Sequence, residues 1–336
     1  MRIKAFICGF EGLRLTPGEV AFVRREQPWG FILFARNIAN PAQARELTDR
    51  LRDLAGRADV PILIDQEGGR VQRLKPPLWP AYLPGRRLGA IHSRDSGKGL
   101  RAAWLQSRLI AFDLAAIGVN VDCLPVLDVP QDGAHDVIGD RAYSLLPDEV
   151  ARLGRAAAAG LIAGGVLPVI KHIPGHGRAM SDSHLALPRV DCPAGELGCT
   201  DFYPFMQLAD LPLAMTAHVV YTAIDARRPA TLSKKVLGGV VRGWMGYDGL
   251  VMSDDLSMQA LSGDYSARTR SSFEAGCDIV LHCNGDMAQM EEIAAAAPVL
   301  KGDARRRADS ALRRLNEMQP ADEAALRAEY AELTAA

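Results

Sequence analysis

Eight short apolar runs recur along the chain, and segments with helical features separate them. Runs of this length between turn signals predict buried strands, and strands that alternate with helices predict a parallel sheet. The expected strands are 6–10, 30–34, 61–65, part of 119–129, 166–170, 213–218, 249–254 and 277–281. No connection between them resembles a hairpin. The pattern therefore predicts an α/β protein with a (β/α)8 TIM barrel, and not an open doubly wound sheet.

Several helices have recognisable starts. Thr16 and Asn40 are each followed by proline, and Glu19 stands three residues after Thr16, as in a capping box. Further helices are expected over 98–117, from about 148 to the double glycine at 164–165, and from Ser233 to about 246.

The chain length fits one barrel with a short addition. Barrels of this class run from roughly 200 to beyond 400 residues, and this chain has 336. We expect the barrel to occupy 1–300 and a helical extension to occupy 301–336, because the tail is rich in Ala, Glu and Arg with apolar residues at helical spacing. No G-x-G-x-x-G follows the first strand, which argues against a dinucleotide-binding fold.

The charge balance bears on the partners. Lys plus Arg numbers 39 and Asp plus Glu numbers 40, so no global field attracts nucleic acid or an anionic membrane. We expect a neutral or zwitterionic small molecule as partner, and a monomer. No run reaches the roughly 20 apolar residues that a membrane span needs.

The cysteines indicate a compartment. Six are scattered along the chain without a C-x-x-C pair, which predicts buried free thiols in a reducing cytosol. The first residues lack the apolar core and cleavage site of a signal peptide. We therefore expect a cytoplasmic protein.

Polar residues stand at the ends of several expected strands. In a barrel these positions face the mouth, where active sites lie. Carboxylates and hydrogen-bond donors together suit a sugar, since each hydroxyl needs both a donor and an acceptor. We expect His218 and His282 to be hydrogen-bonded wall residues, and Asp128 and Arg36 to orient their neighbours. The strand-end set is Arg36, Asp65, Asp128, Lys171, His172, His218, Asp254 and His282.

The segment from Ile173 to Ser183 is expected to be a long loop, because its prolines and glycines oppose regular structure. His176 within it could order the loop or act in catalysis. A zinc or iron site is an alternative for the histidine-rich stretch, but the spacing matches no common ligand motif, so we expect no metal and no cofactor. The residues of that alternative site are His172, His176, Asp182 and His184.

Four motifs make the function more specific. Together they resemble the signature blocks of glycoside hydrolase family 3, and most closely its single-domain bacterial β-N-acetylglucosaminidases (β-hexosaminidases) of peptidoglycan recycling. The resemblance spans roughly residues 31–284, with the blocks in order, and it implies a metal-independent hydrolase. The four motifs are Ile64–Arg73, Lys171–Gly177, Asp182–His184 and Met252–Met258.

The resemblance also implies roles for individual residues. Asp254 matches the catalytic nucleophile, and His184 matches the acid/base with Asp182 as its partner. The implied reaction is retaining removal of terminal β-linked N-acetylglucosamine (GlcNAc) from peptidoglycan fragments such as GlcNAc-1,6-anhydroMurNAc, with or without peptide. Cell-wall turnover, cell shape and cell division would depend on it. The residues that match the sugar-binding set are Asp65, Arg73, Arg141, Lys171 and His172.

The chemistry of these side chains agrees with those roles. A carboxylate can form the glycosyl-enzyme, and a histidine with a pKa near 6.5 can give and take a proton. Asp182 and His184 are two residues apart, so in an extended segment they point the same way. Asp255 is the alternative nucleophile, but strand alternation predicts its side chain on the opposite side from Asp254.

Three other functions stay open. A β-glucosidase of the same family would take its acid/base from a second domain, for which the chain has no room. A phosphorylase would use phosphate as acceptor at the same site, since a neutral histidine does not repel an anion. A sugar-binding protein would have lost catalysis, although the full set Asp254, Asp182 and His184 argues against this.

Overall fold

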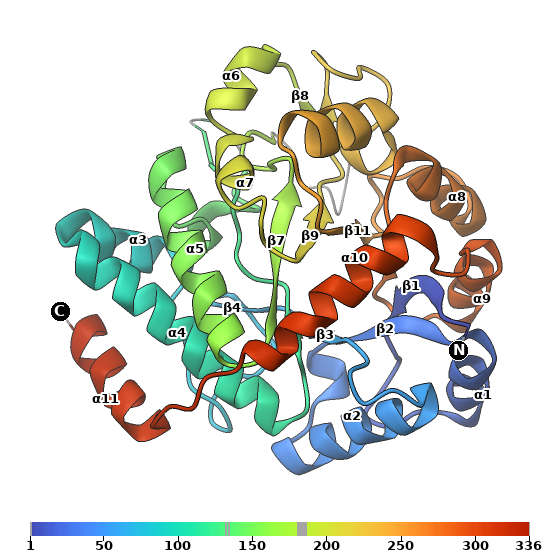
Figure 1. Cartoon of the computed structure of the whole chain (residues 1–336), viewed down its shortest axis with the longest axis horizontal. Coiled ribbons are helices and arrows are strands. Elements are labelled where there is room, and N and C mark those ends of the chain that lie inside the picture. Colours follow the sequence, from blue (N-terminus) through green and yellow to red (C-terminus); the bar gives the residue numbers. More distant parts are fainter. Residues whose placement is uncertain (1, 132, 134, 180–186, 336) are drawn as a thin grey trace.

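The computed structural model describes residues 2–131, 133, 135–179 and 187–335, and eight parallel strands within it form a closed barrel (Figure 1). Each strand pairs with the strands before and after it in the chain, and the last pairs with the first. The expected (β/α)8 barrel is therefore confirmed. Its strands are β1 (Lys4–Cys8), β2 (Pro28–Leu33), β3 (Ile62–Ile64), β6 (Val121–Asp122), β7 (Leu167–Ile173), β9 (Leu213–Thr216), β11 (Leu250–Asp255) and β12 (Ile279–His282).

Most strand bounds differ from expectation by one to three residues, and the contacts explain two of the differences. β1 begins and ends two residues earlier, because Lys4 already pairs with β2 while Gly9 lies against the backbone of residue 283. β7 runs on to Ile173, since Lys171 and Ile173 keep their pairing with β9. The carboxyl ends meet at one mouth, toward which the β7 arrow in Figure 1 points.

The helices lie around the barrel, and the two expected caps are present. Thr16 and Glu19 form the capping box, and Asn40 accepts a hydrogen bond from the Gln43 amide. The α-helices are α1 (Pro17–Glu26), α2 (Pro41–Ala55), α3 (Gly85–Arg94), α4 (Ser96–Ala116), α5 (Pro147–Ala163), α6 (Ala194–Cys199), α7 (Tyr203–Gln207), α8 (Tyr265–Ala275), α9 (Met287–Ala296), α10 (Gly302–Arg313) and α11 (Glu323–Thr334). The short 3-10 helices are η1 (Ala35–Asn37), η2 (Gly139–Arg141), η3 (Ala230–Leu232) and η5 (Arg314–Glu317), and η4 (Lys235–Trp244) is a π-helix.

Two small sheets were missed by the sequence pattern. The loop after β3 folds into a small antiparallel hairpin, β4 (Gln66–Gly68) and β5 (Val71–Gln72), which the sequence analysis did not predict. Strands of two and three residues are too short to show a period. A second small sheet pairs β8 (Arg189–Val190) with β10 (Val220–Tyr221) in parallel. The barrel strands themselves pair in parallel, so none of them is joined to the next by a hairpin turn, as expected.

The core has an inner and an outer part. Alternate strand residues such as Ile7, Val169 and Met252 fill the barrel, and the others pack against the surrounding helices. Leu300 and two alanines of α10 join the inner cluster. Arg307 of α10 pairs with Asp278, just before β12, so α10 covers the amino-terminal end of the barrel and passes across it in Figure 1.

The last helix, α11, lies beside α4. Arg101 pairs with Glu329 at 2.6 Å, and Arg327 pairs with Asp113 at 2.7 Å. The tail is thus helical and packed on the barrel, as expected. The division into 1–300 and 301–336 stays a prediction. α10 lies in the expected extension, yet two of its alanines belong to the barrel core.

All six cysteines are free thiols, as expected, although Cys199 is exposed and Cys283 is partly exposed. Of the helices that the structure describes, none has the length and apolarity to span a membrane.

One helix absent from the sequence prediction, α3, packs closely on the segment that carries Arg141. Gly85 and Gly89 lie one turn apart on it. A Cβ atom at Gly89 would stand 1.7 Å from the Tyr143 carbonyl oxygen, and one at Gly85 would stand 2.3 Å from that of Arg141. Only glycine allows this approach.

We expect Gly89→Ala to lower the free energy of unfolding by about 1–3 kcal/mol, because the new methyl group must displace backbone. Urea denaturation of the purified variant measures this. Gly97→Ala is the control, since its Cβ would meet only the Asp95 carboxylate at 3.5 Å. Equal stability of Gly89→Ala and wild type would contradict the packing described.

Candidate active site

A cavity of about 260 Å³ lies at the carboxyl ends of the barrel strands. It brings together every expected site residue that the structure describes, although these lie as much as 189 positions apart, from Asp65 to Asp254. Asp182 and His184 lie outside the described residues. The six expected residues that line the cavity are Asp65, Arg73, Arg141, Lys171, His172 and Asp254.

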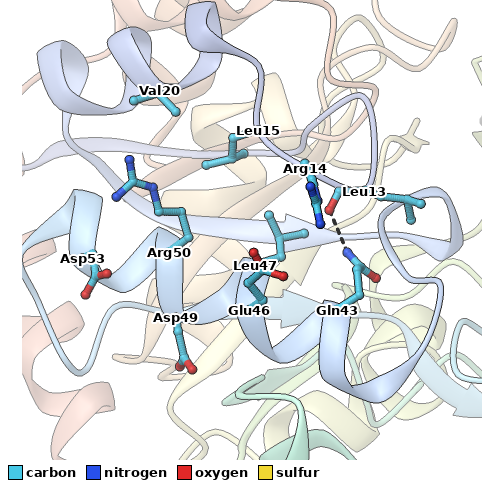
Figure 2. Close-up of a pocket in the computed structure, with 10 residues that line it drawn as sticks. All are labelled: Leu13, Arg14, Leu15, Val20, Gln43, Glu46, Leu47, Asp49, Arg50 and Asp53. Carbon is cyan, nitrogen blue, oxygen red and sulfur yellow. Dashed lines mark hydrogen bonds between the residues drawn. The ribbon is translucent and has the colours of Figure 1, made fainter.

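A larger cavity of about 500 Å³ lies outside the barrel, between α2 and the segment around the start of α1 (Figure 2). Leu15, Val20 and Leu47 form its apolar part, and Gln43 donates a hydrogen bond to the Leu13 carbonyl at 2.7 Å. Its charged lining residues are exposed, except Asp49, which is partly buried. Convergent buried charges distinguish the barrel mouth, so we take the mouth as the candidate site.

The hairpin after β3 places two of the site residues. The Gln66 side chain accepts hydrogen bonds from the Arg73 and Leu74 amides at 2.9 Å each, which closes the hairpin. Gly68 and Gly69 have φ of +97° and +57°, and glycine adopts these values without strain. Asp65 and Arg73 are thereby brought within 2.9 Å of each other.

Five charged side chains form an alternating chain across one side of the mouth: Arg73, Asp65, Lys171, Glu67 and Arg141. Lys171 Nζ lies 2.8 Å from Asp65 Oδ1 and 2.7 Å from Glu67 Oε1. Arg141 grips Glu67 with two hydrogen bonds of 2.8 Å. The side chains of Glu67 and Lys171 are only 4% and 2% exposed, so each depends on the others for its charge.

These ion pairs fix the ionisation states of Asp65, Glu67 and Lys171. Burial alone would raise the pKa of the two carboxyl groups, but the cations hold the pKa of Asp65 well below its usual range and lower that of Glu67 to about 2. Burial alone would lower the pKa of Lys171, but Asp65 and Glu67 raise it. All three groups are therefore charged near neutral pH.

Asp128 organises the histidines beside this chain. It is fully buried, and its Oδ2 lies 2.7 Å from His172 Nδ1. Its Oδ1 accepts hydrogen bonds from the His172 and His176 amides at 3.2 and 2.6 Å. The expectation that Asp128 orients a neighbour is confirmed. Burial, followed by the nearby His172, lowers the pKa of His176 to about 4, so that ring is neutral.

Asp254 and Asp255 end β11. The Asp254 amide donates to Thr216 Oγ1 at 3.3 Å, and Asp254 Oδ1 accepts from the Asp255 amide at 2.7 Å. Asp255 also lines the cavity, so the expectation of opposite sides was wrong. A register shift against β12 between Met252 and Asp255 breaks the alternation.

The Asp255 carboxylate nevertheless has a structural role, because neighbouring loop residues already donate hydrogen bonds to it. Its carboxylate accepts hydrogen bonds from Ser257 Oγ at 2.5 Å and from the Ser257 and Cys283 amides at 3.0 and 3.1 Å. These bonds hold the loops that follow β11 and β12.

The wall residues are mostly as expected. His218 is buried between Thr231 Oγ1 at 2.7 Å and the Asp255 carbonyl at 3.0 Å. Arg36 donates to backbone carbonyls of Phe10 and residue 283. His282 is buried edge-on against Tyr265, and its Nδ1 lies 3.9 Å from Asp255 Oδ1. Neither ring nitrogen makes a hydrogen bond to the described residues, so the expectation of a hydrogen-bonded wall residue was wrong for His282.

Glu67 is a buried charged lining residue that the sequence analysis did not single out. It lies within the motif Ile64–Arg73, and an acid between Gln66 and the two glycines at 68 and 69 looks like a loop residue. Its only sequence signal is its place two residues after Asp65. In an extended segment that spacing puts both side chains on one face.

Within the described ranges, no group of three or more His, Cys, Asp or Glu side chains could hold a metal ion. Two members of the alternative metal site, Asp182 and His184, fall outside those ranges. The absence of a metal or cofactor stays a prediction.

The sequence matches the family model for the glycosyl hydrolase family 3 N terminal domain over residues 14–318. A β-hexosaminidase from Alkalilimnicola ehrlichii is 42% identical over 288 residues, which cover 84% of this chain and 82% of that protein. One from Pseudomonas aeruginosa is 38% identical over 293 residues, or 86% and 85% of the two chains.

The fold has a matching solved structure. NagZ from Neisseria gonorrhoeae, in complex with N-trifluoroacetyl-D-glucosamine, matches with a TM-score of 0.86 at 32% identity and covers 99% of both chains. This chain therefore belongs to glycosyl hydrolase family 3, and within that family it is a glycosidase of the β-hexosaminidase type.

Proposed function

We propose that the protein is a retaining exo-β-N-acetylglucosaminidase that removes terminal β-linked GlcNAc from peptidoglycan fragments. Its substrates would be GlcNAc-1,6-anhydroMurNAc and the peptide-bearing forms. The observation that carries the proposal is the convergence of Asp254 and the five expected sugar-binding residues on one cavity. The P. aeruginosa β-hexosaminidase and the NagZ neighbour support the amino-sugar specificity.

Asp254 is the proposed nucleophile. It is partly exposed at the end of β11 and lines the same cavity as the charge chain, by which we mean the row Arg73, Asp65, Lys171, Glu67 and Arg141. The neighbouring His218 is buried and its pKa is lowered by burial, and His176 is also neutral, so neither ring cancels the negative charge of Asp254. A carboxylate oxygen of Asp254 attacks the anomeric carbon, and the bond from that carbon to the departing oxygen breaks.

His184, supported by Asp182, is the proposed acid/base. In the first step it gives its proton to the departing oxygen, so the aglycone leaves as an alcohol. In the second step it takes a proton from water, whose oxygen attacks the same carbon and releases Asp254. The sugar leaves with its original β configuration.

The charge chain is the proposed glycone subsite. Asp65 and Lys171 present a fixed acceptor and a fixed donor, and such charged groups make stronger hydrogen bonds to hydroxyls than neutral ones do. His172 is held by Asp128 and completes the wall. Because these groups are paired before substrate arrives, little reorganisation accompanies binding.

We further propose that the enzyme works in the cytoplasm as a monomer without a metal. The free thiols support a reducing compartment.

Trapping should identify the nucleophile. A slow fluorinated N-acetylglucosaminyl substrate is expected to leave an adduct on the peptide that contains Asp254, detected by mass spectrometry after proteolysis. Asp254→Asn should give no adduct and should lose nearly all activity. An adduct on another peptide, or rapid turnover without any adduct, would contradict the assignment.

The acid/base role of His184 and Asp182 can be tested through the dependence of kcat/KM on the leaving group. His184→Ala is expected to lower kcat/KM by about 10²–10⁴-fold for natural substrates, and far less for an aryl glycoside whose leaving group needs no proton. Asp182→Asn removes a carboxylate that favours the imidazolium, so the pKa of His184 should fall. The basic limb of the pH–rate profile then moves to lower pH. Equal losses on both substrates would argue against a general acid at residue 184.

The substrate class can be tested directly. We expect purified protein to release GlcNAc from GlcNAc-1,6-anhydroMurNAc, with or without stem peptide, and to leave internal sugars of longer chains uncut. Product analysis by liquid chromatography with mass spectrometry measures this, with Asp254→Asn as the blank. Release from chitooligosaccharides alone would exclude the peptidoglycan role.

A further inference from the structure

Glu67 has contacts that suggest a specific task in the site. It lies in β4 of the hairpin between β3 and α3 and lines the cavity, but its side chain is only 4% exposed. It receives no role from the motif assignments above. Burying such a carboxylate destabilises the folded state unless interactions with its partners offset the loss of hydration.

Both carboxylate oxygens of Glu67 are occupied. Oε2 accepts from Arg141 Nε at 2.8 Å, and Oε1 accepts from Arg141 Nη2 at 2.8 Å and lies 2.7 Å from Lys171 Nζ. With its oxygens so engaged, Glu67 acts on a ligand through Arg141 and Lys171. It is a positioning group and not a contact group.

The two cations reach Glu67 from distant parts of the chain. Arg141 comes from η2 and Lys171 from β7. The positive charges of Lys171 and Arg141 repel each other. Both side chains are also long and flexible, so holding each in one position without a partner costs rotamer entropy. The shared oxygen of Glu67 fixes the distance between them.

We propose that Glu67 sets the spacing of Lys171 and Arg141 so that both donate hydrogen bonds to neighbouring hydroxyls of the terminal sugar. The inference rests on the proposed function and adds a residue that determines how tightly this site holds its sugar. Asp65 cannot replace Glu67, because it is shared between Lys171 and Arg73.

The test is Glu67→Gln, which keeps the shape of the side chain and removes its charge. We expect kcat/KM for an aryl N-acetyl-β-glucosaminide to fall about 10- to 100-fold, mostly through KM, because misplaced donors weaken sugar binding in the ground state and the transition state alike. The inhibition constant for free GlcNAc should rise in parallel.

A double-mutant comparison separates positioning from simple bracing of the fold. In an Arg141→Ala background, Glu67→Gln should cause much less than its usual loss of kcat/KM, since one of the groups it positions is already gone.

Asp278→Asn is the matched control. Asp278 also bridges two cations, Arg242 at 2.6 Å and Arg307 at 3.0 Å, and its side chain is 5% exposed, but it lies at the other end of the barrel. It should lower the melting temperature and leave KM and the GlcNAc inhibition constant unchanged.

The outcomes divide cleanly. If Glu67→Gln behaves like Asp278→Asn, Glu67 is only a structural brace and the inference is wrong, while the proposed function stands. If wild type neither hydrolyses the glycoside nor binds GlcNAc in calorimetry, the proposed function and the inference both fail.

Discussion

The site depends on the pairing of buried charges at the mouth of the barrel. Lys171 is 2% exposed and would be strongly destabilised as an isolated ion, since the penalty for burying one charge amounts to several kcal/mol even after relaxation. Asp65 and Glu67, at 2.8 and 2.7 Å, offset that penalty. The consequence is a rigid row of alternating charges that keeps its ionisation near neutral pH, and this row faces the cavity in which the sugar would bind.

A group of histidines around Asp128 lies beside this row of charges and differs from it. Asp128 holds the His172 ring and two backbone amides, and His176 behind it is neutral. Burial lowers the pKa of His176 and of His218, so both rings are neutral near Asp254, whereas the cations of the mouth gather around Asp65 and Glu67. In the proposed function, Asp254 would use its negative charge for covalent chemistry, and the fixed cations would bind the sugar.

The sequence predicted much of this because the strand signal is local. An apolar run followed by a polar residue marks both a barrel strand and its active end, and Asp65, Lys171 and Asp254 all followed from that pattern. The hairpin of β4 and β5 escaped because its strands are too short to show a period. Asp255 was placed on the wrong side because alternation assumes an unbroken ladder, and the register shift against β12 breaks it. Glu67 was passed over because nothing local distinguishes a buried acid from a loop acid.

The sequence by itself determined the eight strands, their order, the family resemblance and the identity of the residues at the strand ends, since all of these depend on local pattern and spacing. Tertiary structure alone decided which charges meet. The contacts of Glu67 with Arg141 and Lys171 join positions 74 and 104 residues away from it, and only closure of the barrel brings them within hydrogen-bond distance. Ion pairing falls off with distance in space, and sequence separation carries no information about that distance until the strands are in register.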